Sequence, residues 1–148
     1  MANHIVFNRP DGGVSIIIPA SDVPIATVLA RSVPEDATDV TVVDEITLPT
    51  DRTYRNAWEQ VAGKITVAMP KARVIHSGRI AQAIIDESAR LGLLPAGLRL
   101  QGKIKEADEA VADKATVDEL DLTALATQMA KASNPTTLNA IWPSVLSR

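Results

Sequence analysis

The two histidines, His4 and His76, are the first residues to consider for acid–base or metal chemistry. They fall in different predicted elements, and neither has a second His or a Glu at the spacing of a metal-binding pair. The chain also contains no cysteine, which removes thiol catalysis and thiolate ligands. We therefore interpret both histidines as structural or solvent-exposed, and we expect no metal site.

Four pairs of neighbouring acidic residues are the other candidates for acid–base catalysis. Consecutive residues on a helix do not face each other, whereas a catalytic pair shares a cleft and has shifted pKa values. Glycine-rich nucleotide motifs and the nucleophile motif of α/β hydrolases do not occur in the sequence. We predict a non-enzymatic protein with no catalytic residue and no cofactor; an enzyme would need a deep pocket lined by His76 and paired carboxylates. The pairs, interpreted as solvated charge, are Asp44–Glu45, Asp86–Glu87, Asp108–Glu109 and Asp118–Glu119.

One segment, Leu48 to Glu59 (LPTDRTYRNAWE), concentrates the residue types that dominate binding hot spots. It holds the only Tyr and one of two Trp, and Asp51 is placed to close a turn after Pro49 and to pair with the next residue, an arginine. Two interpretations stay open: contact with a partner, or packing of this segment onto the helix predicted at Pro70. We favour packing. The candidate residues are Arg52, Tyr54, Arg55 and Trp58, together with Trp142 near the end of the chain.

The first half of the chain has the pattern of β-strands. Two β-branched runs, Ile5–Phe7 and Val14–Pro19, flank the turn residues Arg9–Gly13, which predicts a β-hairpin. A helix over Pro24–Arg31, capped by Ser21 or Asp22, follows. Further short strands are predicted over Asp39–Val43, Ile46–Leu48, Tyr54–Val61 and Lys64–Met69, with Trp58 pairing across a turn at Gly63.

The second half has the pattern of helices. Pro70–Arg90 is predicted as a helix that Gly92 and Pro95 end. Ala96–Lys114 is predicted as a second helix with a thin apolar stripe, which suits a helical arm. Thr116–Glu119 resembles a capping box for a third helix that reaches Ala132. A last short helix, capped by Thr136 or Thr137, is expected to run through Trp142.

Strands followed by helices indicate an α+β fold, with a β-rich module over residues 1–69 and a helical region over 70–148, as two small subdomains or one continuous domain. The hydrophobic content of 46% is that of a folded protein. The net charge of −3 and the mixing of both signs give no footprint for nucleic acid. No signal peptide or membrane-spanning run is predicted, so we expect no membrane partner.

Four short motifs stand out along the chain: RPDGGV (Arg9 to Val14), LPTDRTYRNAWE, MPKAR (Met69 to Arg73) and LNAIWP (Leu138 to Pro143). In this order they resemble a family of small proteins encoded in bacteriophage tail regions, some of which are similar to tail-fibre assembly chaperones. The resemblance implies a structural component of the tail, fibre or baseplate that contacts other tail or fibre proteins. It implies a place in the tail of the virion after synthesis in the bacterial cytoplasm. A fibre chaperone that leaves the virion and a host-directed regulator are the alternatives, and self-association is left open.

Overall fold

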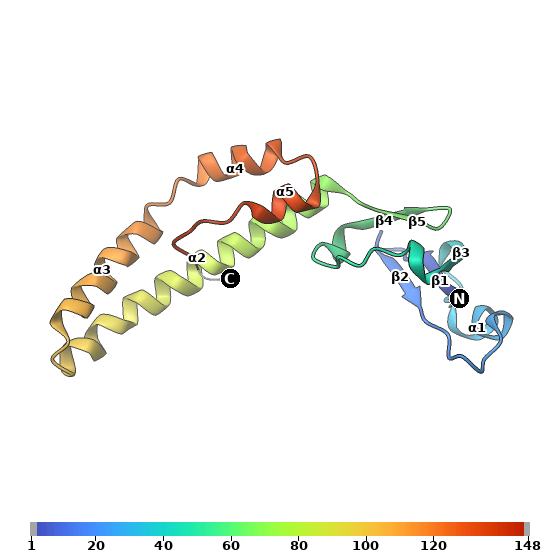
Figure 1. Cartoon of the computed structure of the whole chain (residues 1–148), viewed down its shortest axis with the longest axis horizontal. Coiled ribbons are helices and arrows are strands. Elements are labelled where there is room, and N and C mark those ends of the chain that lie inside the picture. The colour runs from blue at the N-terminus through green and yellow to red at the C-terminus, as the bar shows by residue number, and fades with distance from the viewer. Residues whose placement is uncertain (1–2, 147–148) are drawn as a thin grey trace. The chain divides into compact units, whose positions relative to one another are not determined.

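The computed structural model describes residues 3–146 and divides into two compact units, Met1–Ala72 and Arg73–Arg148. The first contains antiparallel strands in two small sheets and the second contains helices, so the predicted α+β fold is confirmed (Figure 1). The sequence placed the change from strands to helices between residues 69 and 70, three residues before the division between the units.

A β-hairpin opens the β unit, as predicted. Strands β1 (Asn3–Asn8) and β2 (Val14–Ile17) pair antiparallel, with Asn8 opposite Val14. The turn between them depends on Gly12, whose φ of 84° is costly for other residues. Asp11 closes it, because its Oδ1 accepts a hydrogen bond of 2.8 Å from the Gly13 amide.

Strand β3 (Thr38–Asp44) pairs with the other edge of β1 and completes a sheet of order β2-β1-β3. Alternate residues of a strand point to opposite faces. Ile5 and Phe7 therefore pack on one face with Val28 of helix α1 (Ile25–Ser32), whereas Val6 faces the opposite side. Helix α1 was predicted correctly, but no side chain caps it: its N-cap residue is Pro24.

The second sheet consists of β4 (Trp58–Val61) and β5 (Lys64–Val67), joined by a two-residue turn. Trp58 pairs with Val67, as the sequence suggested. The strand predicted over Ile46–Leu48 was wrong: Glu45–Thr47 forms a short 3-10 helix, because Asp44 accepts a hydrogen bond from the Ile46 amide. The strand predicted over Tyr54–Val61 forms only from Trp58, because Arg55–Ala57 forms another 3-10 helix before β4.

The indole of Trp58 joins the two sheets. It is 1% exposed and packs with Val6 and Val14 in one buried cluster, against which Leu48, Ile65 and other side chains of both sheets lie. The sequence had suggested that Trp58 packs onto the helix at Pro70; the cluster that surrounds it comes from the two sheets. Its Nε1 has no hydrogen-bond acceptor, which makes this a contact of shape and apolar area.

The turn between β4 and β5 brings backbone close to β3. Ala62 and Gly63 have φ values of 51° and 84°, the combination of a type I′ hairpin. Asp39 holds the turn, because its Oδ2 accepts a hydrogen bond of 2.9 Å from the Ala62 amide. A Cβ on Gly63 would lie 2.7 Å from Val43 Cγ1 and 2.9 Å from Thr41 Cγ2, so only glycine fits.

The longest element is α2 (Met69–Leu100), which corrects the predicted stop at Gly92 and Pro95. Both residues lie inside the helix. Leu91 beside them is 3% exposed, and Ala107, Ala110 and Val117 of the next helix are also buried. This packing outweighs the free-energy cost of placing Gly92 and Pro95 inside a helix. The helix ends in a Schellman turn, in which Gly102 has φ 76° and the Lys103 amide donates to the Leu98 carbonyl.

Three shorter helices follow: α3 (Ile104–Asp118), α4 (Leu122–Lys131) and α5 (Pro135–Ala140). The second predicted helix, Ala96–Lys114, was wrong at both ends: the Schellman turn falls inside it, and α3 continues to Asp118. The predicted capping box was also wrong. Thr116 lies within α3 and donates to the Ala112 carbonyl, and Asp121 caps α4. For α5 the cap is Asn134, and Thr137 is the third residue of its capping box.

We predict that Trp58→Ala lowers the free energy of unfolding of the β unit by about 3–5 kcal/mol, because it empties the cluster between the sheets. Trp58→Phe should cost less, since it also removes an N–H that has no acceptor. Native-state hydrogen exchange of the β1 amides measures the effect, with Trp142→Phe as the control. Unchanged β1 protection in Trp58→Ala would show that the indole serves another purpose.

We predict that Gly63→Ala destabilises the β unit by about 2 kcal/mol or more, because the new Cβ meets β3 side chains at a positive φ. Urea unfolding followed by fluorescence in a Trp142→Phe background reports this unit through Trp58 alone. The matched control is Gly97→Ala in α2, where a Cβ has nothing within 4 Å. It should leave the fluorescence transition unchanged and stabilise the helical unit by up to about 1 kcal/mol.

Candidate interaction surface

The hot-spot segment of the β unit is divided between core and surface. Tyr54 and Trp58 are 2% and 1% exposed, whereas Arg52 and Arg55 are exposed. The two aromatic residues therefore pack in the core of the β unit. Of the four candidate residues in this segment, the two arginines are the ones that a partner can reach.

A turn at Asp51 holds this segment in place. Asp51 Oδ1 accepts hydrogen bonds from the Thr53 amide at 2.9 Å and from Thr53 Oγ1 at 2.6 Å. These bonds hold the pKa of the Asp51 carboxyl below its usual range. The turn after Pro49 forms as expected, but the carboxylate engages Thr53 in place of the predicted Arg52.

Trp142, the remaining candidate, belongs to the helical unit and is half-buried. Its ring meets that of His76 edge-on, with 6.0 Å between centroids, and its Nε1 donates to the Leu146 carbonyl at 3.2 Å. His76 is 1% exposed, and its Nε2 donates to the Ile141 carbonyl at 2.6 Å. Together these contacts fasten the segment after α5 to α2, which gives Trp142 a structural role.

A hollow of about 420 Å³ lies beside these rings, and His76 is one of its lining residues. Its one acidic lining residue is Asp86, which accepts a hydrogen bond of 2.8 Å from Gln82 Nε2. The paired carboxylates that an acid–base site needs do not line it. The lining residues are His76, Arg79, Gln82, Ala83, Asp86, Asn139 and Trp142.

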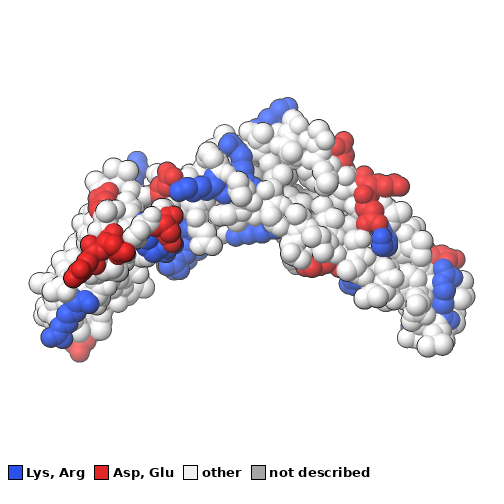
Figure 2. Space-filling view, turned by 180° about the vertical axis from the view of Figure 1, so that it is seen from behind, with Lys and Arg blue, Asp and Glu red and all other residues white. Residues whose placement is uncertain are grey.

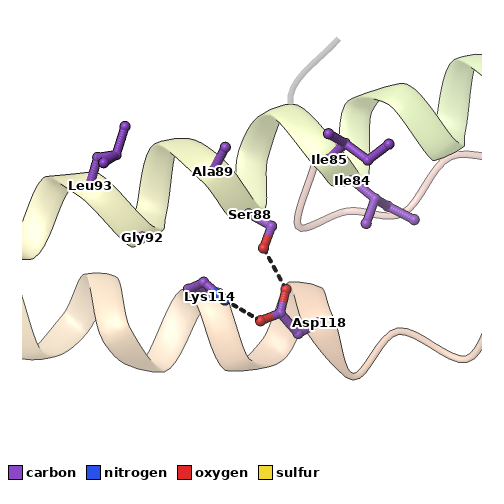
Figure 3. Close-up of a pocket in the computed structure, with 8 residues that line it drawn as sticks. All are labelled: Ile84, Ile85, Ser88, Ala89, Gly92, Leu93, Lys114 and Asp118. Carbon is purple, nitrogen blue, oxygen red and sulfur yellow. Dashed lines mark hydrogen bonds and ion pairs between the residues drawn. The ribbon is translucent and has the colours of Figure 1, made fainter.

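A larger groove, of about 590 Å³, runs between α2 and α3 (Figure 3). Its charged residues are Lys114 and Asp118, which pair at 2.5 Å, while Ser88 Oγ donates to Asp118 at 2.6 Å. These two partners lower the pKa of the Asp118 carboxyl. The two charges neutralise each other. The rest of the lining is apolar or small: Ile84, Ile85, Ala89, Gly92 and Leu93.

A second groove, of about 350 Å³, lies between α2 and α4 and shares Ile84 and Ile85 with the first. No charged residue lines it. Several apolar side chains along the two grooves are strongly exposed, with Leu93 at 80%, Ile85 at 61% and Leu122 at 60%. The other lining residues are Ser77, Ile80, Ala81, Leu125, Ala126 and Met129. We call the two grooves together the apolar groove of α2.

Outside the apolar groove of α2, the surface carries charged side chains of both signs (Figure 2). On the face shown in Figure 2, basic and acidic side chains are interspersed. Over residues 3–146 no three His, Asp or Glu side chains are grouped closely enough to hold a metal ion. Within the same range, no helix is both long and apolar enough to cross a bilayer.

The sequence did not identify the apolar groove. Uncharged residues recur along α2 at intervals of three and four, but the expected stop at Gly92 interrupted the pattern. The contribution of Leu122 and Ala126 depends on how α4 docks, which the local sequence does not encode.

In comparisons with known proteins, no protein-family model, curated protein or solved structure matches this chain.

Proposed function

We propose that this chain is a non-enzymatic component of a bacteriophage tail that acts through contacts with other tail or fibre proteins. The observation that carries the proposal is the apolar groove of α2, whose only charged residues pair with each other. An exposed apolar surface rimmed by polar residues is typical of a protein–protein contact. The four motifs that resemble phage tail-region proteins supply the biological setting.

The β unit offers a second contact. Tyr54 and Trp58 anchor the segment in the core, and the turn at Asp51 fixes its backbone. Arg52 and Arg55 are thereby presented from a rigid base, which reduces the entropy lost when a partner binds. Arginine suits this position because its guanidinium forms paired hydrogen bonds with carboxylates.

Three of the candidates for acid–base chemistry are engaged in structural contacts, which favours a non-enzymatic role. His76 is committed to a backbone carbonyl, and Asp118 is committed to Lys114 and Ser88. Asp86 engages Gln82. Each group thus has a structural partner that would have to be given up for catalysis.

A transient fibre chaperone is the second candidate, and the same groove favours it. A groove lined with uncharged apolar residues can shield the apolar segment of a fibre before it assembles. This role requires that the chain leaves the fibre, whereas a structural component stays.

We predict that the chain co-purifies with intact tailed particles in a fixed ratio to other tail proteins, because a structural component is retained. Quantitative mass spectrometry of gradient-purified particles measures this ratio, with the cleared lysate as control. A chain that is abundant in the lysate and missing from particles would refute the structural role. Co-expression with the fibre protein encoded by the neighbouring gene would then test the chaperone role. A chaperone raises the yield of folded fibre, and an unchanged yield would remove that role as well.

We predict that replacing both exposed arginines, Arg52→Glu with Arg55→Glu, reduces incorporation into particles at least about tenfold while the fold stays intact. The matched control is Arg31→Glu, an exposed arginine of α1 outside the segment. Far-UV circular dichroism checks that both variants fold. Normal incorporation of the double variant would remove the segment from the contact surface.

A further inference from the structure

The solvent-facing side of α2 carries an uncharged stripe. Seven residues separated by four, three and four positions lie along one line of the helix, since eleven residues make three turns. All seven are exposed, and the two large ones, Val74 and Ile85, are 71% and 61% exposed. The four central members, Ala81, Ile85, Ala89 and Gly92, also line the apolar groove. The whole stripe consists of Val74, Gly78, Ala81, Ile85, Ala89, Gly92 and Ala96.

This stripe is symmetric about Ile85. Ala81 and Ala89 lie four positions on either side of it, and Gly78 and Gly92 lie seven positions on either side. A two-fold axis at Ile85 therefore sets alanine against alanine and glycine against glycine when two α2 helices run antiparallel. At a two-fold interface the same patch must be complementary to itself.

The charges of the helical unit favour the same orientation. The N-terminal half of α2, residues 69–85, contains three basic residues and no acidic one, and one of the three, Lys71, is paired with Glu59. Helix α3, which packs beside the C-terminal half, contains five acidic and two basic residues, and it stays net negative when Lys103 before it is included. Antiparallel pairing brings the basic half of each copy toward the acidic α3 of the other, whereas parallel pairing sets basic against basic.

The ends of the stripe carry charges that are already compensated. Lys71 and Arg99 lie fourteen positions on either side of Ile85 and would face each other across the two-fold axis. Lys71 forms an ion pair with Glu59 at 3.2 Å, and Arg99 forms one with Asp108 at 2.8 Å. Their repulsion is therefore reduced at the two places where like charges meet.

We propose that two copies of this chain associate through the apolar groove of α2, with the two α2 helices antiparallel and Ile85 at the two-fold axis. The glycines allow the close approach that this needs. A Cβ at Gly78 would have nothing within 4 Å, and a Cβ at Gly92 would meet only the flexible side chain of Lys114, whose Cε would lie 3.4 Å away. Leu122 of α4 extends the apolar contact on the far wall of the groove. The inference does not rest on the proposed phage function and can be tested on the purified chain.

The first experiment measures mass in solution. Sedimentation equilibrium should give twice the 15.8 kDa of one chain. Ile85→Glu should weaken association about a hundredfold or more, because it buries two like charges at the axis. The matched control, Val111→Glu, changes an apolar residue of α3 that is 51% exposed and should stay dimeric. A wild-type chain that remains single up to about 0.5 mM, where even a complex with a Kd of about 0.1 mM is mostly formed, would overturn the proposal.

The second experiment tests the orientation and uses the lack of cysteine in the chain. Ala81→Cys and Ala89→Cys chains are mixed and oxidised under mild conditions. Antiparallel pairing predicts a disulfide between the two different variants, because like positions lie about 12 Å apart along the axis at 1.5 Å per residue. Disulfides only between identical variants would indicate parallel pairing and would overturn the arrangement. Both substitutions lie on the exposed face, so this test stands even if Ile85→Glu fails to fold.

Discussion

The β unit depends on a single buried side chain, the indole of Trp58, which fills the space between two small sheets. Neither sheet can bury enough apolar surface alone, since isolated hairpins are marginal in water. Val6 and Val14 supply one side of the contact, and the bond from the Ala62 amide to Asp39 fixes the second sheet in register over the first. The exposed arginines before β4 owe their fixed position to this buried anchor.

Helix α2 has the corresponding role in the helical unit. Arg73 donates hydrogen bonds to the carbonyls of Met129 and Ala132 at the end of α4. His76 donates to the Ile141 carbonyl after α5, and Ser88 donates to Asp118 of α3. Each later segment is therefore attached to a different turn of one helix. The shorter helices cover only part of its circumference. The uncharged stripe is left outside, and the apolar groove is the consequence of this one-sided covering.

Local signals predicted the elements whose ends are set locally. The β1–β2 hairpin has turn residues at its centre, and α1 stands between prolines. Prediction failed where packing outweighs local propensity. Gly92 and Pro95 signal a helix stop, but burial against α3 keeps α2 intact. Thr116 has the sequence of a helix cap but lies inside α3. The same division holds for the candidate site. Trp58 was identified because aromatic residues are scarce, whereas the groove requires knowledge of how α4 docks.

Pro95 sets how α2 can open. Proline has no amide hydrogen, so the Leu91 carbonyl lacks the hydrogen bond that a helix normally provides four residues later. The last turns, from Ala96 to Leu100, are held by the Schellman turn at Gly102 and by the pair between Arg99 and Asp108. Fraying that starts at the α2–α3 turn would therefore stop at Pro95, where the hydrogen-bond ladder is already interrupted. From this interruption we expect the tip of the helix to open in smaller local events than the body, which is held by the rest of the unit.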